Sequence, residues 1–334
     1  MTQIQISKQN RFRSLEIGVY LGFGICDLEL LKRMAFALCD DGFQMDPDQK
    51  VIFSMVEKLV RGASRSSPLP SGERAGVKGI IAEALGLKER EAIGLVGAGG
   101  KTTLMYRLAK ELSLSGKRVV TTTTTKILEP KSDETNFLFV DSDEKKIKDF
   151  VWRHLDQYRH VTVARERLGS GKLKGISPRL VNELWSFDKI DTIIVEADGA
   201  AGRPVKAPRE WEPVIPRATT LVVAILGVDG VGRELNEENA FQPGRISEIT
   251  GIRPGEKLTD EAMAILMTHA EGIFKGASSS TRAIAFLNKV DIPGGVTKAK
   301  TIARKIFEKK RGQIERVVLG QLKKEPPVAE VMFP

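Results

Sequence analysis

The sequence predicts an α/β fold in which a mostly parallel sheet carries helices on both faces. From Ile80 onward, short runs of β-branched and aliphatic residues alternate with segments of helical periodicity. The runs at 93–96, 192–197 and 220–226 have the composition of strands buried on both faces of a sheet. A chain of 334 residues with 41% hydrophobic content is long enough to bury such a core. Strands that alternate with helices favour parallel pairing, because a helix returns the chain to the same edge of the sheet.

The expected elements follow one another along the chain. Each strand prediction rests on an apolar or β-branched run, and each helix prediction on the spacing of apolar residues. We expect strands at 93–96, 118–125, 136–140, 160–164, 192–197, 220–226, 282–287 and 314–319. We expect helices at 80–87, 101–115, 145–158, 178–187, 245–251, 259–272 and 296–310.

Residues 1–79 differ from the rest and are expected to form an N-terminal extension. Apolar spacing predicts two short helices near 28–38 and 52–59, and residues 62–79 have the composition of a linker. Residues 67–79 resemble translated intergenic repeat sequence, so part of this extension is expected to be an accidental upstream start. Residues 80–334 are expected to form one P-loop nucleotide-binding α/β domain.

Composition restricts the compartment and the partners. The net charge of +9, from 52 basic and 43 acidic side chains, attracts polyanions such as nucleotides only weakly. Aromatic residues make up 6%, so we expect no nucleic-acid partner. The two cysteines, Cys26 and Cys39, lack metal spacing and fit a reducing compartment. No apolar run is long enough to span a bilayer, and we expect a cytoplasmic protein without a membrane partner.

Residues 91–103 predict a phosphate-binding turn. A short apolar strand runs into Gly97, Gly99 and Gly100, and a helix is expected to begin directly afterwards. The glycines allow backbone N–H groups to point inward at an anion, and the helix N-terminus adds partial positive charge. A glycine-rich turn that binds no ligand is the alternative.

Lys101, Thr102 and Thr103 open that helix and favour the ligand-binding interpretation. Lys101 can reach the β- and γ-phosphates of a nucleotide, and the Thr102 hydroxyl can bind Mg²⁺. The match to the P-loop pattern G-x-x-x-x-G-K-[ST] is imperfect, because Leu95 occupies the position of the first glycine. The turn resembles the compact G-T-N-G-K-T-T loop of Mur-family ligases. We therefore expect a P-loop NTPase-like fold that binds ATP or GTP with Mg²⁺.

The strand at 192–197 leads to two carboxylates, Glu196 and Asp198. An apolar strand with an acid at its tip is the Walker-B arrangement, which holds Mg²⁺ beside a P-loop. The two acids share strand parity, so both can face the same side. We expect Asp198, with Thr102, to bind the metal, and Lys101, Glu196 and Asp198 to be catalytic. Acids that only cap the next loop are the alternative.

Other strand ends carry weaker signals. One or two hydroxyls of the run Thr121–Thr125 are candidates to lie near the γ-phosphate and Mg²⁺, and a purely β-prone run is the alternative. Arg203 and Lys206 either contact an anion or belong to a solvated loop. The glycine-rich stretch around Asp229 is expected to form a wall of the site. The three histidines show no metal spacing, so we expect surface or helix positions for them.

A late strand at 283–287 runs into Asn288, Lys289 and Asp291. Asn-Lys-x-Asp after a buried strand is the guanine-recognition motif of G proteins. The carboxylate accepts from guanine N1–H and N2–H₂, the amide meets N7 or supports the loop, and the lysine stem covers the base. The alternative is that Asp291 caps the turn at 293–295.

With these motifs in order, the chain resembles the YqeC family, the selenium-dependent hydroxylase accessory proteins of bacteria. Five blocks carry the resemblance, which spans about residues 80–330. They are Leu95-Val-Gly-Ala-Gly-Gly-Lys-Thr-Thr103, Gly116-Lys-Arg-Val-Val-Thr-Thr-Thr-Thr-Thr125, Val195-Glu-Ala-Asp-Gly-Ala-Ala-Gly-Arg-Pro-Val-Lys-Ala-Pro208, Gly227-Val-Asp-Gly-Val-Gly232 and Leu287-Asn-Lys-Val-Asp291. The resemblance implies a role in maturation of selenium-dependent molybdenum hydroxylases, with the hydroxylase or its cofactor-maturation proteins as partners.

Three functional interpretations follow. The first is an NTPase whose hydrolysis drives that maturation. The second is a Mur-like ligase or a kinase acting on a small molecule, although the chain is too short for a complete multidomain Mur ligase. The third is a non-hydrolysing scaffold that is switched by nucleotide.

Overall fold

The computed structural model describes residues 80–309 and 314–334. The chain divides into two units, Met1–Glu73 and Arg74–Pro334. The first unit, together with the two short helices and the linker expected before residue 80, lies outside the described residues. The fold below is that of the second unit.

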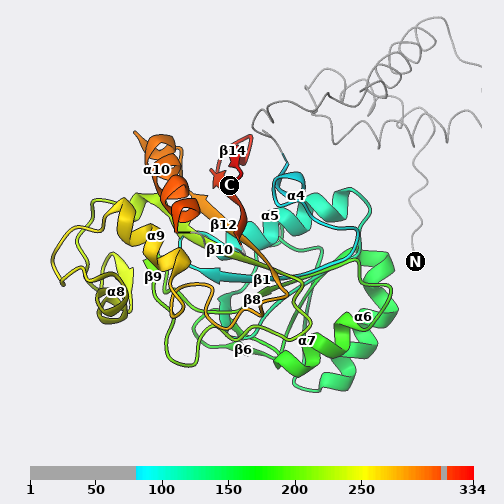
Figure 1. Ribbon diagram of the computed structural model, residues 1–334. Helices are drawn as coiled ribbons and strands as arrows, with labels where there is room; N and C mark the ends of the chain where they lie inside the picture. Colours follow the sequence, from blue (N-terminus) through cyan, green and yellow to red (C-terminus); the bar gives the residue numbers. More distant parts are fainter. Residues whose placement is uncertain (1–79, 310–313) are drawn as a thin grey trace, which may run out of the picture. The chain divides into compact units, whose positions relative to one another are not determined.

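A nine-stranded sheet forms the centre of the described part (Figure 1). Its strand order is β14-β13-β12-β10-β1-β8-β2-β5-β4, and every neighbouring pair is parallel except β13–β14. The strands are β1 (Glu91–Gly97), β2 (Val119–Thr123), β4 (Phe137–Val140), β5 (His160–Ala164), β8 (Thr192–Glu196), β10 (Leu221–Gly227), β12 (Arg282–Asn288), β13 (Ile314–Gly320) and β14 (Val328–Met332). The predicted mostly parallel sheet is confirmed.

Helices cover both faces of this sheet. Because successive strand residues point to opposite faces, Leu95 of β1 packs in one core with α4 (Ile81–Ala84) and α5 (Lys101–Leu114). Val96 packs on the other face with α8 (Pro243–Thr250), α9 (Asp260–Thr268) and α10 (Gly295–Glu308). Ala92, on that same face, lies in a third core with α6 (Glu144–Tyr158) and α7 (Pro178–Trp185). The α/β prediction with helices on both faces is therefore confirmed.

The structure also contains elements that the sequence pattern does not reveal. β3 (Lys126–Leu128), β7 (Lys172–Lys174) and β6 (Glu166–Leu168) form a small antiparallel sheet, and β9 (Val205–Lys206) pairs with β11 (Ala240–Phe241). The strand expected at 118–125 instead ends at Thr123. Gly175 crosses there so closely that a Cβ on it would overlap the Thr123 carbonyl, and its N–H donates to the Thr125 carbonyl. The helix expected at 80–87 is likewise shorter, spanning only α4.

The carboxyl ends of the parallel strands meet at one edge of the sheet, where ligands bind in folds of this kind. β1 lies between β8 and β10, so the glycine turn after β1 is flanked by Glu196 and Gly227 at the tips of its neighbours.

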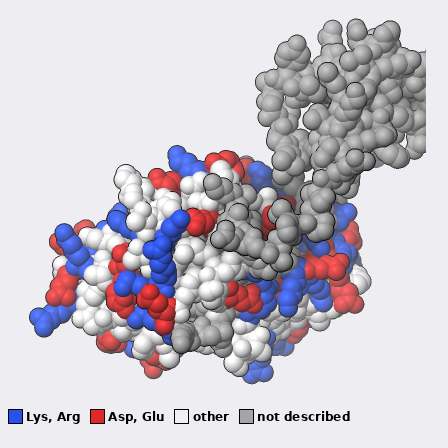
Figure 2. All heavy atoms as spheres, turned by 45° about the horizontal axis from the view of Figure 1, so that its top comes forward, with Lys and Arg blue, Asp and Glu red and all other residues white. Residues whose placement is uncertain are grey.

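On the face shown in Figure 2, basic and acidic side chains are interleaved, without a continuous field of either sign. Among the described residues, no helix combines the length and the apolar character needed to cross a membrane.

Candidate functional site

The turn after β1 is fixed by its glycines and by the tip of β10. Gly97, Gly99 and Gly100 have φ values of +97°, +82° and +144°, which L side chains rarely adopt. A Cβ on Gly97 would overlap the Ile225 carbonyl, and one on Gly99 would lie 2.5 Å from the Gly227 nitrogen. The turn is thus held against β10 by contacts that only glycine permits.

Successive backbone N–H groups of this turn have no acceptor in the described part of the chain. Ala98 N–H donates to the Ile225 carbonyl, and the first helical bond of α5 runs from Leu104 N–H to the Gly100 carbonyl at 2.9 Å. Between them, five N–H groups donate to no described residue and remain open donors, those of Gly99, Gly100, Lys101, Thr102 and Thr103. Open donors at a helix N-terminus form a receptor for an anion.

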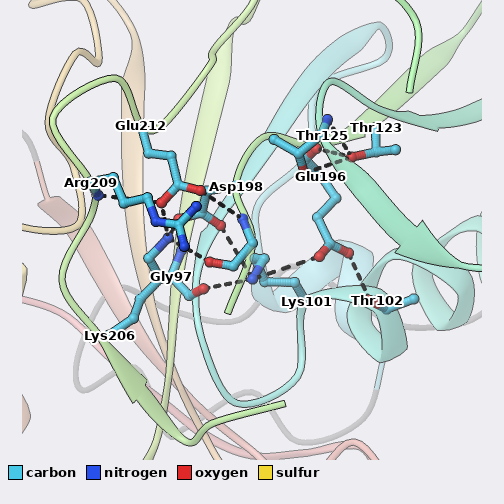
Figure 3. A network of polar contacts seen from close by, with 11 residues as sticks. Gly97, Lys101, Thr102, Thr123, Thr125, Glu196, Asp198, Lys206, Arg209 and Glu212 are labelled. Carbon is cyan, nitrogen blue, oxygen red and sulfur yellow. Dashed lines mark hydrogen bonds and ion pairs between the residues drawn. The ribbon is translucent and has the colours of Figure 1, made fainter. Parts of the chain in front are cut away.

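The Lys101 side chain folds back across the turn and is buried (Figure 3). Its Nζ lies 2.6 Å from the Gly97 carbonyl oxygen, 3.2 Å from Asp198 Oδ1 and 3.7 Å from Glu196 Oε1. Burial by itself lowers the pKa of Lys101, but the carboxylates of Asp198 and Glu196 outweigh it and hold that pKa above its ordinary value. Lys101 is therefore a permanent ammonium ion at the mouth of the turn.

Asp198 is fixed by donors on three sides. Its Oδ2 accepts from Gly97 N–H at 3.0 Å and lies 2.9 Å from Lys206 Nζ, while Oδ1 faces Lys101. Oδ1 is buried and lacks an aligned hydrogen-bond donor, although the Lys101 ammonium is close. Asp198 thus joins the start of the glycine turn to two lysines.

Glu196, at the tip of β8, faces the start of α5. Its Oε2 accepts from the Thr102 hydroxyl at 2.7 Å. Burial raises the pKa of Glu196, and the opposing effects of Lys101 and Thr102 do not cancel this rise. The structure brings Thr102 to Glu196 rather than to Asp198, so the assignment of metal binding to Thr102 and Asp198 stays a prediction.

These oxygens fit a magnesium ion that is held together with phosphate. Among the described residues, no group of three or more His, Cys, Asp or Glu side chains is arranged to hold a metal by itself. Mg²⁺ typically takes one or two protein oxygens and completes its shell with water and phosphate oxygens. The Thr102 hydroxyl and Glu196 carboxylate supply such oxygens beside the open N–H groups of the turn.

Lys206 is a site residue that the sequence left undecided. It is fully buried on β9, where its Nζ lies 2.9 Å from both Asp198 Oδ2 and Glu212 Oε2 and donates to the Gly199 carbonyl at 2.7 Å. The solvated-loop alternative is therefore wrong for Lys206. Its apolar neighbours in sequence, residues 204, 205, 207 and 208, are the signal that could have indicated burial.

The threonine run mainly connects strands. The Thr121 hydroxyl lies 3.0 Å from His160 Nε2, and that of Thr122 donates to the Val163 carbonyl. The Thr123 hydroxyl donates to the Glu196 carbonyl at 2.7 Å and so positions the acid. His160 itself is buried in β5, which corrects the expected surface or helix position.

The strand β12 brings one member of the Asn-Lys-x-Asp motif to the glycine turn. Asn288 Nδ2 donates to the Gly99 carbonyl at 2.8 Å, and its Oδ1 accepts from Leu322 N–H at 3.2 Å. This contact corresponds to the loop-supporting role considered for the amide.

The other two motif residues lie apart from the turn. Lys289 Nζ pairs with Asp229 Oδ2 at 2.9 Å, so the Asp229 loop borders the motif. Asp291 is exposed, and no hydrogen bond or ion pair joins it to any described residue. The turn that Asp291 would cap under the alternative interpretation is closed by Gly295 N–H donating to the Ile292 carbonyl.

Together, the fold and this geometry define a class of protein. A glycine turn with Lys101 and Thr102 at the start of a helix faces an acid-tipped neighbouring strand in a mostly parallel sheet. This is an α/β protein of the P-loop type.

Comparison with known proteins gives the family. The YqeC protein family profile matches residues 93–244. The uncharacterized protein YqeC of Escherichia coli K12 is 30% identical over 246 residues, which cover 73% of this chain and 93% of that protein. The chain belongs to the YqeC family.

A solved structure with a weaker likeness is that of the signal recognition particle 54 kDa protein from Aeropyrum pernix K1 in complex with GDP. The identity is 16% and the TM-score is 0.33, with 91% of this chain and 57% of that chain covered. At this TM-score the likeness carries no argument about function.

Proposed function

We propose that this protein is a magnesium-dependent nucleotide-binding protein that hydrolyses ATP or GTP as an accessory factor in maturation of selenium-dependent molybdenum hydroxylases. The observation that carries the nucleotide part is the row of open N–H groups of the turn, beside a buried ammonium and two carboxylates. The pathway, with the hydroxylase or its maturation proteins as partners, comes from the resemblance of the sequence blocks.

The residues divide the work as follows. The N–H groups of the turn hold the β-phosphate, and Lys101 moves from the Gly97 carbonyl toward the γ-phosphate when the anion arrives. Gly97, Gly99 and Gly100 keep the turn in shape. Thr103 contributes its backbone N–H to the open donors of the glycine turn.

Magnesium supplies neutralisation of phosphate charge at this site. Thr102 and Glu196 would hold it, because their oxygens already lie 2.7 Å apart beside the open N–H groups of the glycine turn. Asp198 keeps Lys101 and the turn in place through its contacts with both. Asn288, Lys289 and Asp291 form the base-recognition segment, in which Asn288 supports the turn.

Calorimetric titration of Lys101→Ala with Mg–ATP and Mg–GTP tests the proposal. We expect nucleotide binding to weaken at least about tenfold, since the variant loses the ammonium group nearest to the glycine turn. Lys110→Ala is the matched control, because Lys110 is an exposed lysine on the same helix. Unchanged affinity of Lys101→Ala for both nucleotides, with a native circular dichroism spectrum, would remove the turn from the proposal.

Phosphate release distinguishes hydrolysis from switching. We expect wild type to release phosphate and Glu196→Gln to bind nucleotide but release phosphate at least about tenfold more slowly. A wild type that binds nucleotide without releasing phosphate, with or without a small-molecule acceptor, would point to the non-hydrolysing scaffold. Phosphate transfer that requires an acceptor would point to the ligase or kinase.

A further inference from the structure

A hollow lies outside the glycine turn, beside the start of α8. Its volume is about 820 Å³, and it is lined by Arg209, Glu210, Trp211, Gln242, Arg245, Glu271 and Lys275. Trp211, one of the lining residues, is 68% exposed. A single exposed tryptophan needs no explanation by itself, so the surrounding charges decide what this hollow can bind.

Arg209 is the lining cation whose charge is not matched by an acid. Its guanidinium lies over two aromatic rings, 4.9 Å from the ring centre of Phe241 and 5.7 Å from that of Trp211. In the described part of the chain, no carboxylate forms an ion pair with it. By contrast, Arg245 pairs with Glu248 at 3.0 Å, and Lys275 pairs with Glu271 at 2.9 Å. The N–H donors of Arg209 are therefore available to a ligand.

The start of α8 adds donors to the same hollow. Helix α8 begins at Pro243, and the side chain of its N-cap Gln242 makes no capping hydrogen bond. The first backbone bond here is from Ile246 N–H to the Gln242 carbonyl, which leaves the N–H groups of Gly244 and Arg245 without an acceptor among the described residues. The Nε of Arg245 is also buried without a hydrogen-bond partner. Gln242 and Arg245 at the start of α8 line the hollow together with Arg209, so donors from two segments lie beside it.

We propose that this hollow is a second ligand site, which binds a small molecule carrying both a planar ring and an anionic group. The ring stacks on the exposed face of Trp211, because stacked aromatic rings bury apolar surface and adopt a favourable relative orientation. The anionic group meets the Arg209 guanidinium and the open N–H groups of α8.

The segment from Lys206 to Glu212 joins this hollow to the glycine turn. Arg209 N–H donates to Glu212 Oε2 at 3.3 Å, and the same oxygen lies 2.9 Å from Lys206 Nζ. Lys206 in turn contacts Asp198, which faces Lys101 (Figure 3). The Arg209 backbone is therefore linked to Asp198 through the side chains of Glu212 and Lys206.

Equilibrium dialysis of the full chain against naphthalene-2-sulfonate tests the proposal without any nucleotide present. Two partial probes are measured beside it. Inorganic sulfate lacks the ring, and naphthalen-2-ol has the ring but lacks the anionic group. We expect naphthalene-2-sulfonate to bind at least about fivefold more tightly than either partial probe. We expect Trp211→Ala and Arg209→Gln each to weaken its binding at least about fivefold.

Two variants serve as matched controls. Trp152→Ala removes another exposed tryptophan, on α6, and Arg217→Gln removes an exposed arginine outside the hollow. Both should bind the probe as wild type does. Failure of wild type to retain naphthalene-2-sulfonate, or equal retention by the Trp211 and Arg209 variants, would overturn the proposal. Nucleotide affinity is measured separately, so a protein that binds no nucleotide would contradict the proposed function and leave this result intact.

Discussion

Replacing Lys206 with methionine tests how strongly the buried charge cluster stabilises the fold. Lys206 is fully buried, and its side chain contacts Asp198 and Glu212, which are 1% and 7% exposed. Lys206→Met keeps most of the apolar stem and removes the ammonium. Asp198 retains Lys101 as a partner. Glu212 keeps only weak backbone donors, Gly199 N–H and Arg209 N–H, both at 3.3 Å.

The expected loss follows from that orphaned carboxylate. Removing one partner of a buried ion pair typically lowers the free energy of unfolding by about 3–5 kcal/mol. For a domain of this size, such a loss lowers the melting temperature by roughly 10 °C. Lys148→Met provides the comparison, because the Lys148–Glu183 pair has a similar distance of 2.7 Å but both side chains are 34% exposed. We expect that exposed pair to contribute less than about 1 kcal/mol.

Urea denaturation, followed by circular dichroism, measures both variants against wild type. The double variant Lys206→Met/Glu212→Gln should be more stable than Lys206→Met, because no uncompensated carboxylate remains at Glu212. The reasoning is refuted if Lys206→Met loses no more stability than Lys148→Met. It is equally refuted if the double variant is less stable than Lys206→Met.

Three further predictions address other parts of the chain. Burial lowers the pKa of His160 to about 4 from an ordinary 6.5. The neutral ring therefore stabilises the fold above pH 6.5, and this contribution is lost as the pH falls toward 4. Wild type should lose about 2 kcal/mol more than His160→Gln between pH 7.5 and pH 5 in urea denaturation, and equal losses would show that His160 does not titrate this way. Asp291→Asn should lose affinity for GTP and gain affinity for XTP in competition binding, because an amide can donate to xanthine O2. An unchanged preference between the two nucleotides would leave Asp291 without a role in base selection. A chain that starts at Ile80 should melt at the same temperature as the full chain, and a drop beyond about 5 °C would show that residues 1–79 stabilise the domain.

The main sheet could be predicted from sequence because most of its strands are continuous runs of β-branched or apolar residues. β5 begins and ends at the predicted residues, His160 and Ala164, and β8 differs by one residue at its end. The strands β3, β6 and β7 have three residues each, which is too short to show a period of two. β14 follows a proline pair at 326–327 and runs antiparallel, so no helix precedes it to indicate another parallel strand.

Part of the candidate site could be predicted because its residues follow one another directly. Lys101 and Thr102 come straight after the glycines, and Glu196 and Asp198 end a strand, so local pattern was sufficient to select them. Lys206 and Glu212 could not be assigned in this way. A lysine in a loop is normally exposed, and its burial here depends on β9 pairing with β11, which is a contact between distant segments.

The packing of the glycine turn also bears on the thermodynamics of ligand binding. Gly97 and Gly99 lie so close to β10 that no side chain fits, and Asn288 holds the Gly99 carbonyl from β12. The backbone of the turn is therefore already ordered by its neighbours before any anion arrives. A flexible loop would lose conformational entropy on closing around a phosphate, at about 1–2 kcal/mol for each residue that becomes fixed. Here that loss has already occurred during folding, so affinity for an anion depends on the donors of the turn and on displaced water rather than on ordering a loop.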